Sequence, residues 1–483
     1  MTAVLLRVLA GELDGAELRG SGEVDVEILD VVHDSRTVSP GALFCCIPGR
    51  RTDGHDHASA AVEAGAVALL VERPLDLPVP QIVVADARAA MAPLAATFFG
   101  HPSAALAVVG ITGTNGKTTT THLLRNVVEA AGRRVEVLGT LSGVRTTPEA
   151  PDLQRTLAAW RDDGVEVVAL EVSSHALELH RVDATRFAVA VFTNLSRDHL
   201  DFHGSMESYF AAKARLFEPD LSARGVVNRD SPYGRLLADT AAIPTDPFSM
   251  DEAVDLHLEA DGSSFTWRGH PVRLALGGAF NVANALAAGH AAAALGIDDA
   301  TIAEGLSLGL VVPGRFELVA AGQPFPVVVD YAHTPDGLEQ LLVAADDLVG
   351  VGPTGERGRV VVVFGCGGDR DATKRPAMGE VAAERADRVV VTADNSRNED
   401  TAAIIEAVKQ GFEHVHPRRA AELVVEPDRR AAIALALAAG RAGDVVLVAG
   451  KGHETTQDIG GVVTLFDDRV VVAEEWARIG GDA

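Results

Sequence analysis

The sequence predicts an α/β protein of three domains, in which a central doubly wound, mostly parallel sheet carries a phosphate-binding loop. Three observations support this prediction. The chain has 483 residues, which is too long for one ordinary domain. Apolar runs of strand length alternate with helical patterns along most of the chain. In the middle section, a glycine-bearing turn joins a buried strand to a helix.

The first section, residues 1–102, is expected to form a small α/β domain. Its predicted strands cover residues 24–32, 42–47, 67–71 and 81–84. Its predicted helices cover residues 58–64, with Gly65 as a C-terminal cap, and residues 87–99. The tripeptide Gly100-His101-Pro102 is typical of a linker and ends this section.

The middle section, residues 103–322, contains the doubly wound sheet. Its predicted strands cover residues 104–111, 135–138, 166–171 and 188–194. Helices are expected at residues 118–131, 206–217 and 282–295, with shorter strands before the last of them. The third section, residues 323–483, is predicted to be a Rossmann-like α/β domain with parallel strands at 327–330, 360–364, 388–392 and 444–449.

Composition narrows the functional class. The chain has 42 basic and 68 acidic residues, which argues against a general nucleic-acid or anionic-membrane surface. Its three cysteines, Cys45, Cys46 and Cys366, form no zinc pattern and indicate a reducing compartment. Since no signal peptide or membrane-spanning run is evident, we expect a cytoplasmic protein.

The turn after the strand at 104–111 is predicted to bind a triphosphate. Its glycines let several backbone N–H groups face one anion at the positive end of the following helix. Lys117 can reach the outer phosphates, and the Thr118 hydroxyl can hold Mg²⁺. The common phosphate-loop pattern is only partly kept, because Ile111 stands where its first glycine would be. The predicted loop residues are Gly113, Thr114, Asn115, Gly116, Lys117, Thr118 and Thr119.

Charged residues follow two more strands of the middle section. Glu171 ends one strand and is a candidate Mg²⁺ ligand, because Mg²⁺ prefers a few carboxylates together with phosphate oxygens. His199 follows the next strand and could bind a second metal ion or contact an acyl group. Taken from the sequence alone, Lys213 is only a polar residue on an amphipathic helix.

Further polar residues lie at predicted strand ends and helix starts. Asn281 is suited either to cap its helix or to contact an adenine edge. Arg315 lies in a tight turn, and Asp330 ends a strand where it could bind a ribose hydroxyl. Arg370, Arg397 and Glu454 follow three strands of the last section, and together they suit a zwitterion, with cations for its carboxylate and a Glu for its ammonium.

Taken together, these stretches resemble the Mur ligase family over almost the whole chain. The motifs that carry the resemblance are His33-Asp34-Ser35-Arg36, the phosphate loop, Thr146-Thr147-Pro148, Glu171 to His175, Asn194 to Asp201, Asp330 to Pro335 and Lys451 to Glu454. The resemblance implies an ATP- and Mg²⁺-dependent ligase of peptidoglycan precursor synthesis. The implied reaction joins meso-diaminopimelate to the D-glutamate of UDP-N-acetylmuramoyl-L-alanyl-D-glutamate through an acyl phosphate.

The resemblance also implies roles for individual residues. Lys213 would be carbamylated to N6-carboxylysine and would bind a second Mg²⁺, joining Thr118, Glu171 and His199 as metal ligands. The nucleotide would contact Asn281, Arg315, Asp330 and His333 in addition to the loop. The UDP substrate would contact Ser35, Arg50, Arg51, Thr52, Thr146, Thr147, Ser173 and Arg181. The incoming amino acid would contact Arg370, Asp394, Asn395, Ser396, Arg397, Gly450 and Glu454.

Three alternatives stay open at this point. The same ligase could use L-lysine or another diamino acid, since Ser396 stands where relatives that use diaminopimelate usually have Pro. A folate polyglutamate ligase is disfavoured by Asp34-Ser35-Arg36 and Thr146-Thr147-Pro148. A non-catalytic nucleotide-binding relative is disfavoured because Lys117, Glu171, His199 and Lys213 are all kept.

Overall fold

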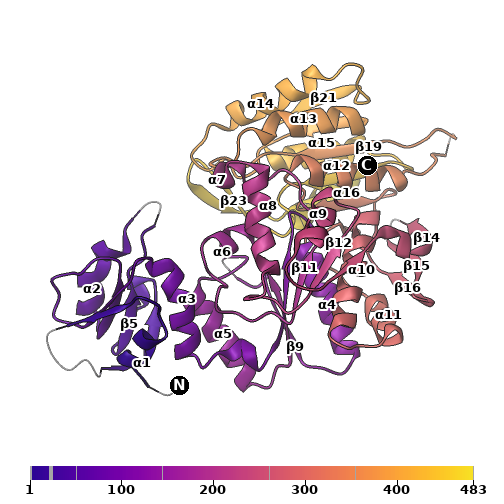
Figure 1. Cartoon of the computed structure of the whole chain (residues 1–483). Coiled ribbons are helices and arrows are strands. Elements are labelled where there is room, and N and C mark those ends of the chain that lie inside the picture. The colour runs from indigo at the N-terminus through magenta and orange to yellow at the C-terminus, as the bar shows by residue number, and fades with distance from the viewer. Residues whose placement is uncertain are drawn as a thin grey trace.

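The computed structural model describes residues 3–20, 26–49, 52–143, 145–259, 261–353 and 355–481. Three α/β units follow one another along the chain, and the C-terminal unit lies above the central one in Figure 1. Among the described helices, none is long and apolar enough to cross a membrane. The three units of alternating helices and strands confirm the α/β architecture expected from the sequence.

The N-terminal unit has a five-stranded sheet in the order β2-β7-β6-β5-β4. Its strands are β2 (Glu17–Arg19), β4 (Asp30–Val32), β5 (Ala42–Cys45), β6 (Ala68–Val71) and β7 (Gln81–Val83). The helices are α1 (Leu6–Gly11), α2 (Ala58–Glu63) and α3 (Ala87–Phe98). Phe98 and Phe99 share an apolar cluster with Ala150 and Ala158 of the next unit, which joins the two units.

One predicted strand of this unit was wrong. Within the described part of residues 24–32, the strand breaks at Leu29 into β3 (Glu27–Ile28) and β4. β3 pairs antiparallel with β1 (Val4–Leu5), whereas β4 pairs parallel with β5. The Leu29 N–H donates to the Gly41 carbonyl, and the Leu29 side chain is exposed. The two pieces therefore belong to different sheets, which a continuous apolar run cannot reveal.

The central sheet is six-stranded and wholly parallel, in the order β13-β12-β11-β8-β10-β9. Its strands are β8 (Ala107–Thr112), β9 (Val135–Leu138), β10 (Val167–Glu171), β11 (Val189–Phe192), β12 (Gly225–Asn228) and β13 (Thr245–Phe248). From β8 the chain runs first to one edge and then to the other. The carboxyl end of β8 is therefore a topological switch point, where ligands bind in such sheets.

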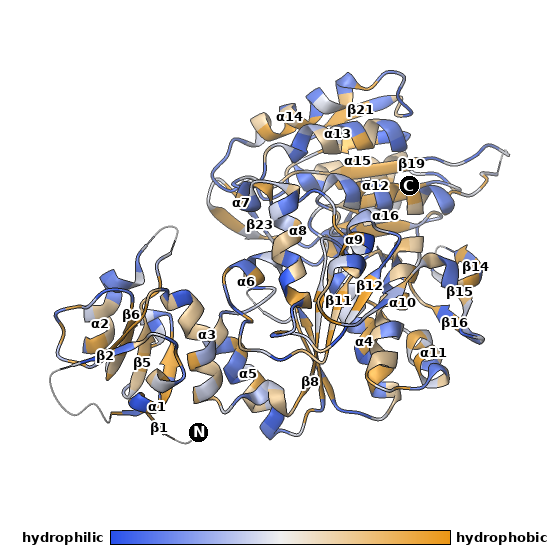
Figure 2. Cartoon of the chain, viewed as in Figure 1, coloured by the Kyte–Doolittle hydropathy of each residue, from blue (hydrophilic) through white to orange (hydrophobic). Residues whose placement is uncertain are grey.

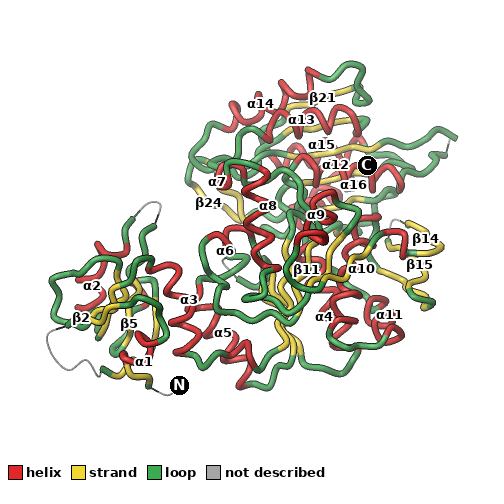
Figure 3. Tube along the Cα trace, in the orientation of Figure 1, coloured by secondary structure: helices red, strands yellow, loops and turns green. Residues whose placement is uncertain are grey.

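Helices cover both faces of the central sheet. One face packs against α4 (Lys117–Ala130), α10 (Ala279–Ala294) and α11 (Asp299–Ser307). The other face packs against α5 (Ala150–Asp162), α6 (Ser174–Glu178) and α8 (Met206–Ala214). A three-stranded antiparallel sheet, β14 (Val254–Glu259), β15 (Gly262–Trp267) and β16 (His270–Leu274), lies beside α11. Figure 3 shows these helices flanking the strands.

The C-terminal unit has a second six-stranded sheet, in the order β17-β18-β22-β19-β20-β21. Its strands are β17 (Glu317–Leu318), β18 (Val327–Asp330), β19 (Val360–Phe364), β20 (Arg388–Val391), β21 (Glu422–Val425) and β22 (Val445–Ala449). All pair in parallel except the edge strand β17. The edge strands β17 and β21 were not predicted, because β17 has two residues and β21 is only half-buried.

Helices on both faces complete this unit. α12 (Pro335–Asp347), α13 (Lys374–Arg385) and α14 (Thr401–His414) cover one face, and α15 (Arg429–Ala439) and α16 (Asp468–Gly481) cover the other. The hairpin of β23 (Thr456–Ile459) and β24 (Val462–Leu465) follows β22 in the chain, and Ile459 pairs with Arg397 in an isolated bridge. Figure 2 shows apolar strands inside the layers and hydrophilic residues on the outward helix faces.

Candidate active site

The predicted phosphate loop lies at the switch point, between the end of β8 and the start of α4. Gly113 and Gly116 have positive φ values of 150° and 86°. A Cβ atom at Gly113 would lie 1.9 Å from the Thr193 Oγ1 atom, and one at Gly116 would lie 2.2 Å from the Asn284 Oδ1 atom. Only glycine therefore fits at these two positions of the turn.

The two lysines of the site meet at one carbonyl oxygen of this loop. Lys117 Nζ donates to the carbonyl oxygens of Gly113 and Thr114, at 2.9 and 2.8 Å. Lys213 Nζ, from α8, donates to the same Gly113 oxygen at 2.8 Å. Lys213 is 1% exposed and lies 4.7 Å above the Tyr209 ring. The structure thus buries a residue that the sequence alone left as a polar position on an amphipathic helix.

Burial lowers the pKa values of both lysines. Desolvation holds the pKa of Lys213 well below its usual value, and the nearby Lys117 lowers it further, while Asp198 opposes the shift. Burial likewise lowers the pKa of Lys117, and Glu171 opposes this shift. A neutral amine is the form that attacks an electrophile, so Lys213 is suited to react with carbon dioxide to form a carbamate.

Glu171, at the end of β10, is buried beside the loop and holds the segment that carries Thr146 and Thr147. Its carboxylate accepts hydrogen bonds from the Thr140 N–H at 2.9 Å and the Thr140 hydroxyl at 3.1 Å. The Thr146 hydroxyl lies 3.1 Å from that of Thr140. The Thr147 hydroxyl donates to the Glu171 carbonyl at 2.8 Å and accepts from the Ser173 N–H. Thr140 therefore binds the Glu171 carboxylate, and Thr147 binds the Glu171 main chain.

Arg181 links this cluster to the N-terminal unit. Its guanidinium donates to the Thr147 carbonyl at 3.1 Å and forms an ion pair with Glu149 at 2.9 Å. Glu149 also pairs with Arg145 and with Arg88 of α3. Burial lowers the pKa of Arg181, and Glu149 opposes this shift. The site is thus continuous with the first unit.

The predicted uridine residues lie in that first unit. Ser35 begins a short 3₁₀ turn in which the Asp34 carboxylate accepts a hydrogen bond from the Arg36 N–H. Thr52 is exposed, and its carbonyl accepts from the Gly49 N–H. Arg50 and Arg51 lie outside the described residues. Their proposed contacts with UDP stay a prediction.

His199 lies where β11 meets the phosphate loop. It has a positive φ of 54°, and its Nε2 atom lies 3.4 Å from the Asp198 carboxylate. Its ring makes an edge-on contact with His175, with centroids 4.8 Å apart. Burial lowers the pKa of His199, and Asp198 opposes the shift. Neutral imidazole is the form that binds metal ions, so the environment suits His199 to that role.

Four contacts join the C-terminal unit to the central unit beside the phosphate loop. Asn115 donates to the Asp336 carboxylate at 2.9 Å, and Arg315 donates to the Thr118 hydroxyl at 3.3 Å. His333 Nε2 lies 4.0 Å from the Asp198 carboxylate. Arg197 donates to the Thr373 hydroxyl at 2.7 Å. The predicted nucleotide residues of both units therefore share one interface.

The remaining predicted nucleotide residues flank this interface. Asp330 accepts from the N–H groups of Phe316 and Ala332, at 2.6 and 2.7 Å, and burial raises its pKa. Arg315 lies 4.4 Å above the Tyr331 ring. Asn281 does not cap α10, because the helix begins at Ala279 and the Asn281 amide donates to the Gly277 carbonyl. Its contact with adenine stays a prediction.

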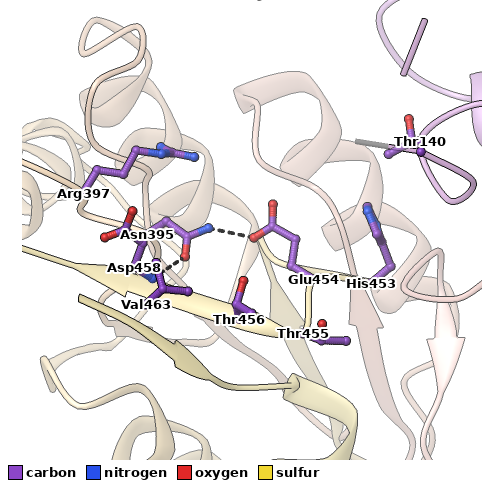
Figure 4. A pocket seen from close by; sticks show the side chains of 10 residues that line it. Thr140, Asn395, Arg397, His453, Glu454, Thr455, Thr456, Asp458 and Val463 are labelled. Atoms are coloured by element: carbon purple, nitrogen blue, oxygen red, sulfur yellow. Dashed lines mark hydrogen bonds between the residues drawn. The ribbon is translucent and has the colours of Figure 1, made fainter. Parts of the chain in front are cut away.

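A cavity of about 460 Å³ opens next to this edge, between the C-terminal unit and the segment of Thr140 and Gly143. Figure 4 shows the side chains of Asn395, Glu454 and Arg397 on one side of it and Thr140 on the other. The Asn395 amide donates to the Glu454 carboxylate at 2.7 Å. The Asn395 amide oxygen also accepts from the Asp458 N–H at 3.0 Å. Lys451 Nζ, fully buried, lies 3.1 Å from Glu454. The cavity is therefore lined by the Arg397 guanidinium and by the carboxylates of Glu454 and Asp458, which suit the opposite charges of a zwitterion.

The other predicted amino-acid residues do not line this cavity. Arg370 is exposed. Ser396 is buried, and its hydroxyl lies 2.7 Å from that of Thr401. Asp394 is buried against Gly450, where a Cβ atom would lie 2.6 Å from the Asp394 carboxylate. Their roles stay predictions.

Sequence reasoning missed several lining residues, namely His453, Thr455, Thr456, Asp458 and Val463. Four of them lie within four residues of Glu454 along the chain, and Val463 faces them from β24. One oxygen of Asp458 is buried without a hydrogen-bond partner among the described residues. Side chains two residues apart on a strand point to the same face, so a strand after Glu454 would place Asp458 on the face of Thr456. This alternation was the signal that could have identified Asp458.

Comparison with known families matches the three units in order. Residues 27–99 match the Mur ligase family catalytic domain, residues 111–292 the Mur ligase middle domain, and residues 314–452 the Mur ligase glutamate ligase domain. These ranges agree with the units of the fold.

Comparison with individual proteins gives the same result. A UDP-N-acetylmuramoyl-L-alanyl-D-glutamate–2,6-diaminopimelate ligase of Streptomyces coelicolor is 45% identical, over 98% of this chain and 96% of its own length. A ligase of the same name from Geobacillus thermodenitrificans is 44% identical, over 96% of this chain and 98% of its own length.

Solved structures agree at the level of the whole chain. A structure of a ligase of that name has 31% identity and a TM-score of 0.66, and covers 99% of this chain and 100% of its own. The MurF ligase of Thermotoga maritima in complex with ADP, at 22% identity and a TM-score of 0.65, shares the fold over 94% of this chain and 98% of its own.

Proposed function

The chain belongs to the Mur ligase family, and from that premise we propose how its site performs the reaction. The protein is an ATP-dependent ligase that joins meso-diaminopimelate to the D-glutamate of UDP-N-acetylmuramoyl-L-alanyl-D-glutamate. One observation carries this proposal: Lys117 and Lys213 share the Gly113 carbonyl beside Glu171, next to a cavity with an amino-acid-like set of charges. The three buried, free cysteines support a cytoplasmic location.

The reaction requires an activated carboxylate, because a carboxylate ion is a poor electrophile. Phosphorylation of the D-glutamate side-chain carboxylate by ATP produces an acyl phosphate with a good leaving group. Lys117 would leave the loop carbonyls and neutralise charge on the outer phosphates. Arg315, Asp330, His333 and Asn281 would hold the rest of the nucleotide.

The site also fits Mg²⁺. Hydroxyl and carboxylate oxygens are the donors that Mg²⁺ prefers, and Thr118, Glu171 and a carbamate on Lys213 would supply them, with His199 beside them. Mg²⁺ would neutralise the phosphate oxygens. The burial of Lys213, which holds the pKa of its amine well below the usual value, supports the carbamate.

The substrates would approach from two sides. The N-terminal unit, residues 1–102, would hold UDP through Ser35, Arg50, Arg51 and Thr52. Thr146, Thr147, Ser173 and Arg181 would hold the dipeptide in the central unit, residues 103–322. The diamino acid would enter the cavity of the C-terminal unit, residues 323–483, where Arg397 would pair with its distal carboxylate and Glu454 with its ammonium. Contacts from Arg370, Asp394, Ser396 and Gly450 would follow if the units close further.

The specificity is tested by phosphate release from ATP with the UDP-muramoyl-dipeptide and either meso-diaminopimelate or L-lysine. We expect diaminopimelate to have the higher kcat/KM by about 100-fold, because L-lysine has no distal carboxylate for Arg397. Arg397→Ala should remove this preference. Arg385→Ala, at an exposed arginine paired with Glu339, is the matched control and should keep it.

Each outcome separates two alternatives. Equal kcat/KM values for both amino acids in the unmodified protein would favour the ligase with broader or lysine specificity. No phosphate release with any diamino acid would favour a non-catalytic nucleotide-binding relative.

A further inference from the structure

Asp458 is a carboxylate of the amino-acid cavity that has no counter-charge. It lies on β23 and lines the cavity, and its Oδ1 atom is buried. Within the described part of the chain, that oxygen accepts no hydrogen bond and the side chain forms no ion pair. Burying a carboxylate oxygen without a donor is costly, so the position suits a ligand that brings a positive charge and N–H donors.

The main chain holds Asp458 next to Arg397. The Asp458 N–H donates to the Asn395 amide oxygen at 3.0 Å, and the Asp458 carbonyl accepts from the Arg397 N–H, also at 3.0 Å. Arg397 also pairs with Ile459 in the isolated parallel bridge. Figure 4 shows the Asp458 and Arg397 side chains on the same side of the cavity. Two side chains of opposite charge are therefore fixed beside each other by main-chain contacts.

The other carboxylate that lines the cavity is already balanced by a cation of the protein. Glu454 forms an ion pair with Lys451 at 3.1 Å and accepts a hydrogen bond from the Asn395 amide at 2.7 Å. Lys451 is fully buried, and its Nζ atom also donates to the Thr456 carbonyl at 2.6 Å. Among the described residues that line the cavity, Asp458 is therefore the carboxylate without a cation.

Arg397 is the matching unpaired cation. Its guanidinium donates to the Gly368 carbonyl at 2.6 Å and forms no ion pair with any described residue, Asp458 included. The cavity thus has one cation and one carboxylate that lie beside each other without neutralising each other. A ligand carbon that carries both a carboxylate and an ammonium group would satisfy both.

We propose that Asp458 binds the ammonium group on the distal carbon of meso-diaminopimelate, while Arg397 binds the carboxylate of the same carbon. This inference rests on the proposed function. Glu454 can still accept a hydrogen bond from that ammonium, but its charge is balanced by Lys451. Two fixed charges that bind two groups on one carbon also select its configuration, because inversion exchanges the ammonium with a hydrogen atom. Asp458 is thus a specificity-determining residue that favours the meso isomer over the LL isomer, which differs at the distal carbon.

The test measures kcat and KM for meso-diaminopimelate, LL-diaminopimelate and L-lysine in Asp458→Asn and Asp458→Glu. Glu406→Gln, at an exposed glutamate paired with Lys409, is the control and should match the unmodified protein. We expect Asp458→Asn to raise KM for meso-diaminopimelate and for L-lysine by about 30-fold each, because both have a distal ammonium, and to change kcat by less than about threefold. The preference for the meso over the LL isomer should fall by about tenfold.

Two further measurements separate binding from a structural role. Asp458→Glu keeps the charge and should recover most of the affinity. The melting temperature of Asp458→Asn should be unchanged, because the hydrogen bonds that hold the hairpin use the main chain of Asp458. Arg397→Ala should raise KM for meso-diaminopimelate alone, since L-lysine has no distal carboxylate.

Three results would overturn the proposal. These are KM values of Asp458→Asn within about threefold of the unmodified protein, a KM increase that spares L-lysine, or an unchanged preference for the meso isomer. Calorimetric binding of meso-diaminopimelate, with ADP and the UDP-muramoyl-dipeptide present, needs no turnover. Normal binding without turnover in the unmodified protein would overturn the proposed function, and the affinity of Asp458→Asn would still decide the role of Asp458. Absence of binding to the unmodified protein would overturn both.

Discussion

The central and C-terminal sheets both bury charged side chains, but they treat them in opposite ways. In the C-terminal unit, Arg429 and Asp468 are both fully buried and form a two-pronged pair, at 2.8 and 2.7 Å. Arg429 also donates to the carbonyl oxygens of Ala393 and Ala449. In the central unit, Lys117 and Lys213 have only carbonyl oxygens of the phosphate loop as hydrogen-bond partners among the described residues.

This difference distinguishes a charged pair that stabilises the fold from lysines that belong to the candidate site. A buried pair with its hydrogen bonds satisfied needs nothing further, and Arg429 joins α15 to α16 and to two strand ends. A buried lysine without a carboxylate partner is costly to charge, so burial disfavours its ammonium form in the free protein. Replacement of the buried basic side chain by Met should therefore lower activity in the central unit and lower stability in the C-terminal unit.

Lys213→Met should produce the largest effect on activity. We expect about a 1,000-fold loss of kcat, because the variant has no amine to carbamylate, whereas the melting temperature should stay the same or rise. Lys213→Ala should show the same loss, and short carboxylic acids should restore part of the activity by replacing the carbamate. Full activity of either variant would contradict the carbamate.

Arg429→Met tests the other side of the comparison, namely the buried ion pair of the C-terminal unit. Removal of one partner leaves Asp468 buried without a counter-charge, and we expect the free energy of unfolding to fall by about 3 kcal/mol. Activity per folded molecule should change little at low temperature. Denaturant unfolding measures the loss, and Arg430→Met, at a half-exposed neighbouring arginine, is the matched control. Loss of activity without loss of stability would place Arg429 in the site instead.

His333 lies between the two units, and its protonation allows the comparison to be tested by changing the pH. Burial and the nearby Lys374 lower its pKa from 6.5 to about 4. The folded state thus favours neutral His333, so this contribution to stability is complete above pH 6.5 and is lost as the pH falls toward 4. Since about a third of the side chain is exposed, solvent screens the effect, and we expect about 1 kcal/mol.

The measurement compares the unfolding free energy of the unmodified protein and His333→Gln between pH 7 and pH 4. The variant should lose less stability over this range, since glutamine has no proton to gain. Identical slopes for the two proteins would show that His333 keeps its ordinary pKa. The difference between the two proteins is the relevant quantity, because His203 and His453 also have lowered pKa values near 4.

Most elements of the fold could be predicted because their causes are local. The strand at β8, the turn with Gly113 and Gly116, and the helix α4 follow one another in the chain, and their patterns predict each other. The strand at 24–32 could not be predicted as two pieces, because its break depends on which neighbours pair with each half. The edge strand β17 was missed because its two residues are too few to show a pattern.

The sequence by itself therefore determined the order of elements, the phosphate loop and the family. Only the tertiary structure decided which charges are paired. Lys213 and Gly113 are 100 residues apart in the chain, and Arg429 and Asp468 are 39 apart. The pairing of a buried charge depends on side chains that folding brings together from distant segments, and no local pattern contains that information. Lys213 consequently looks like an ordinary polar position until the fold surrounds it.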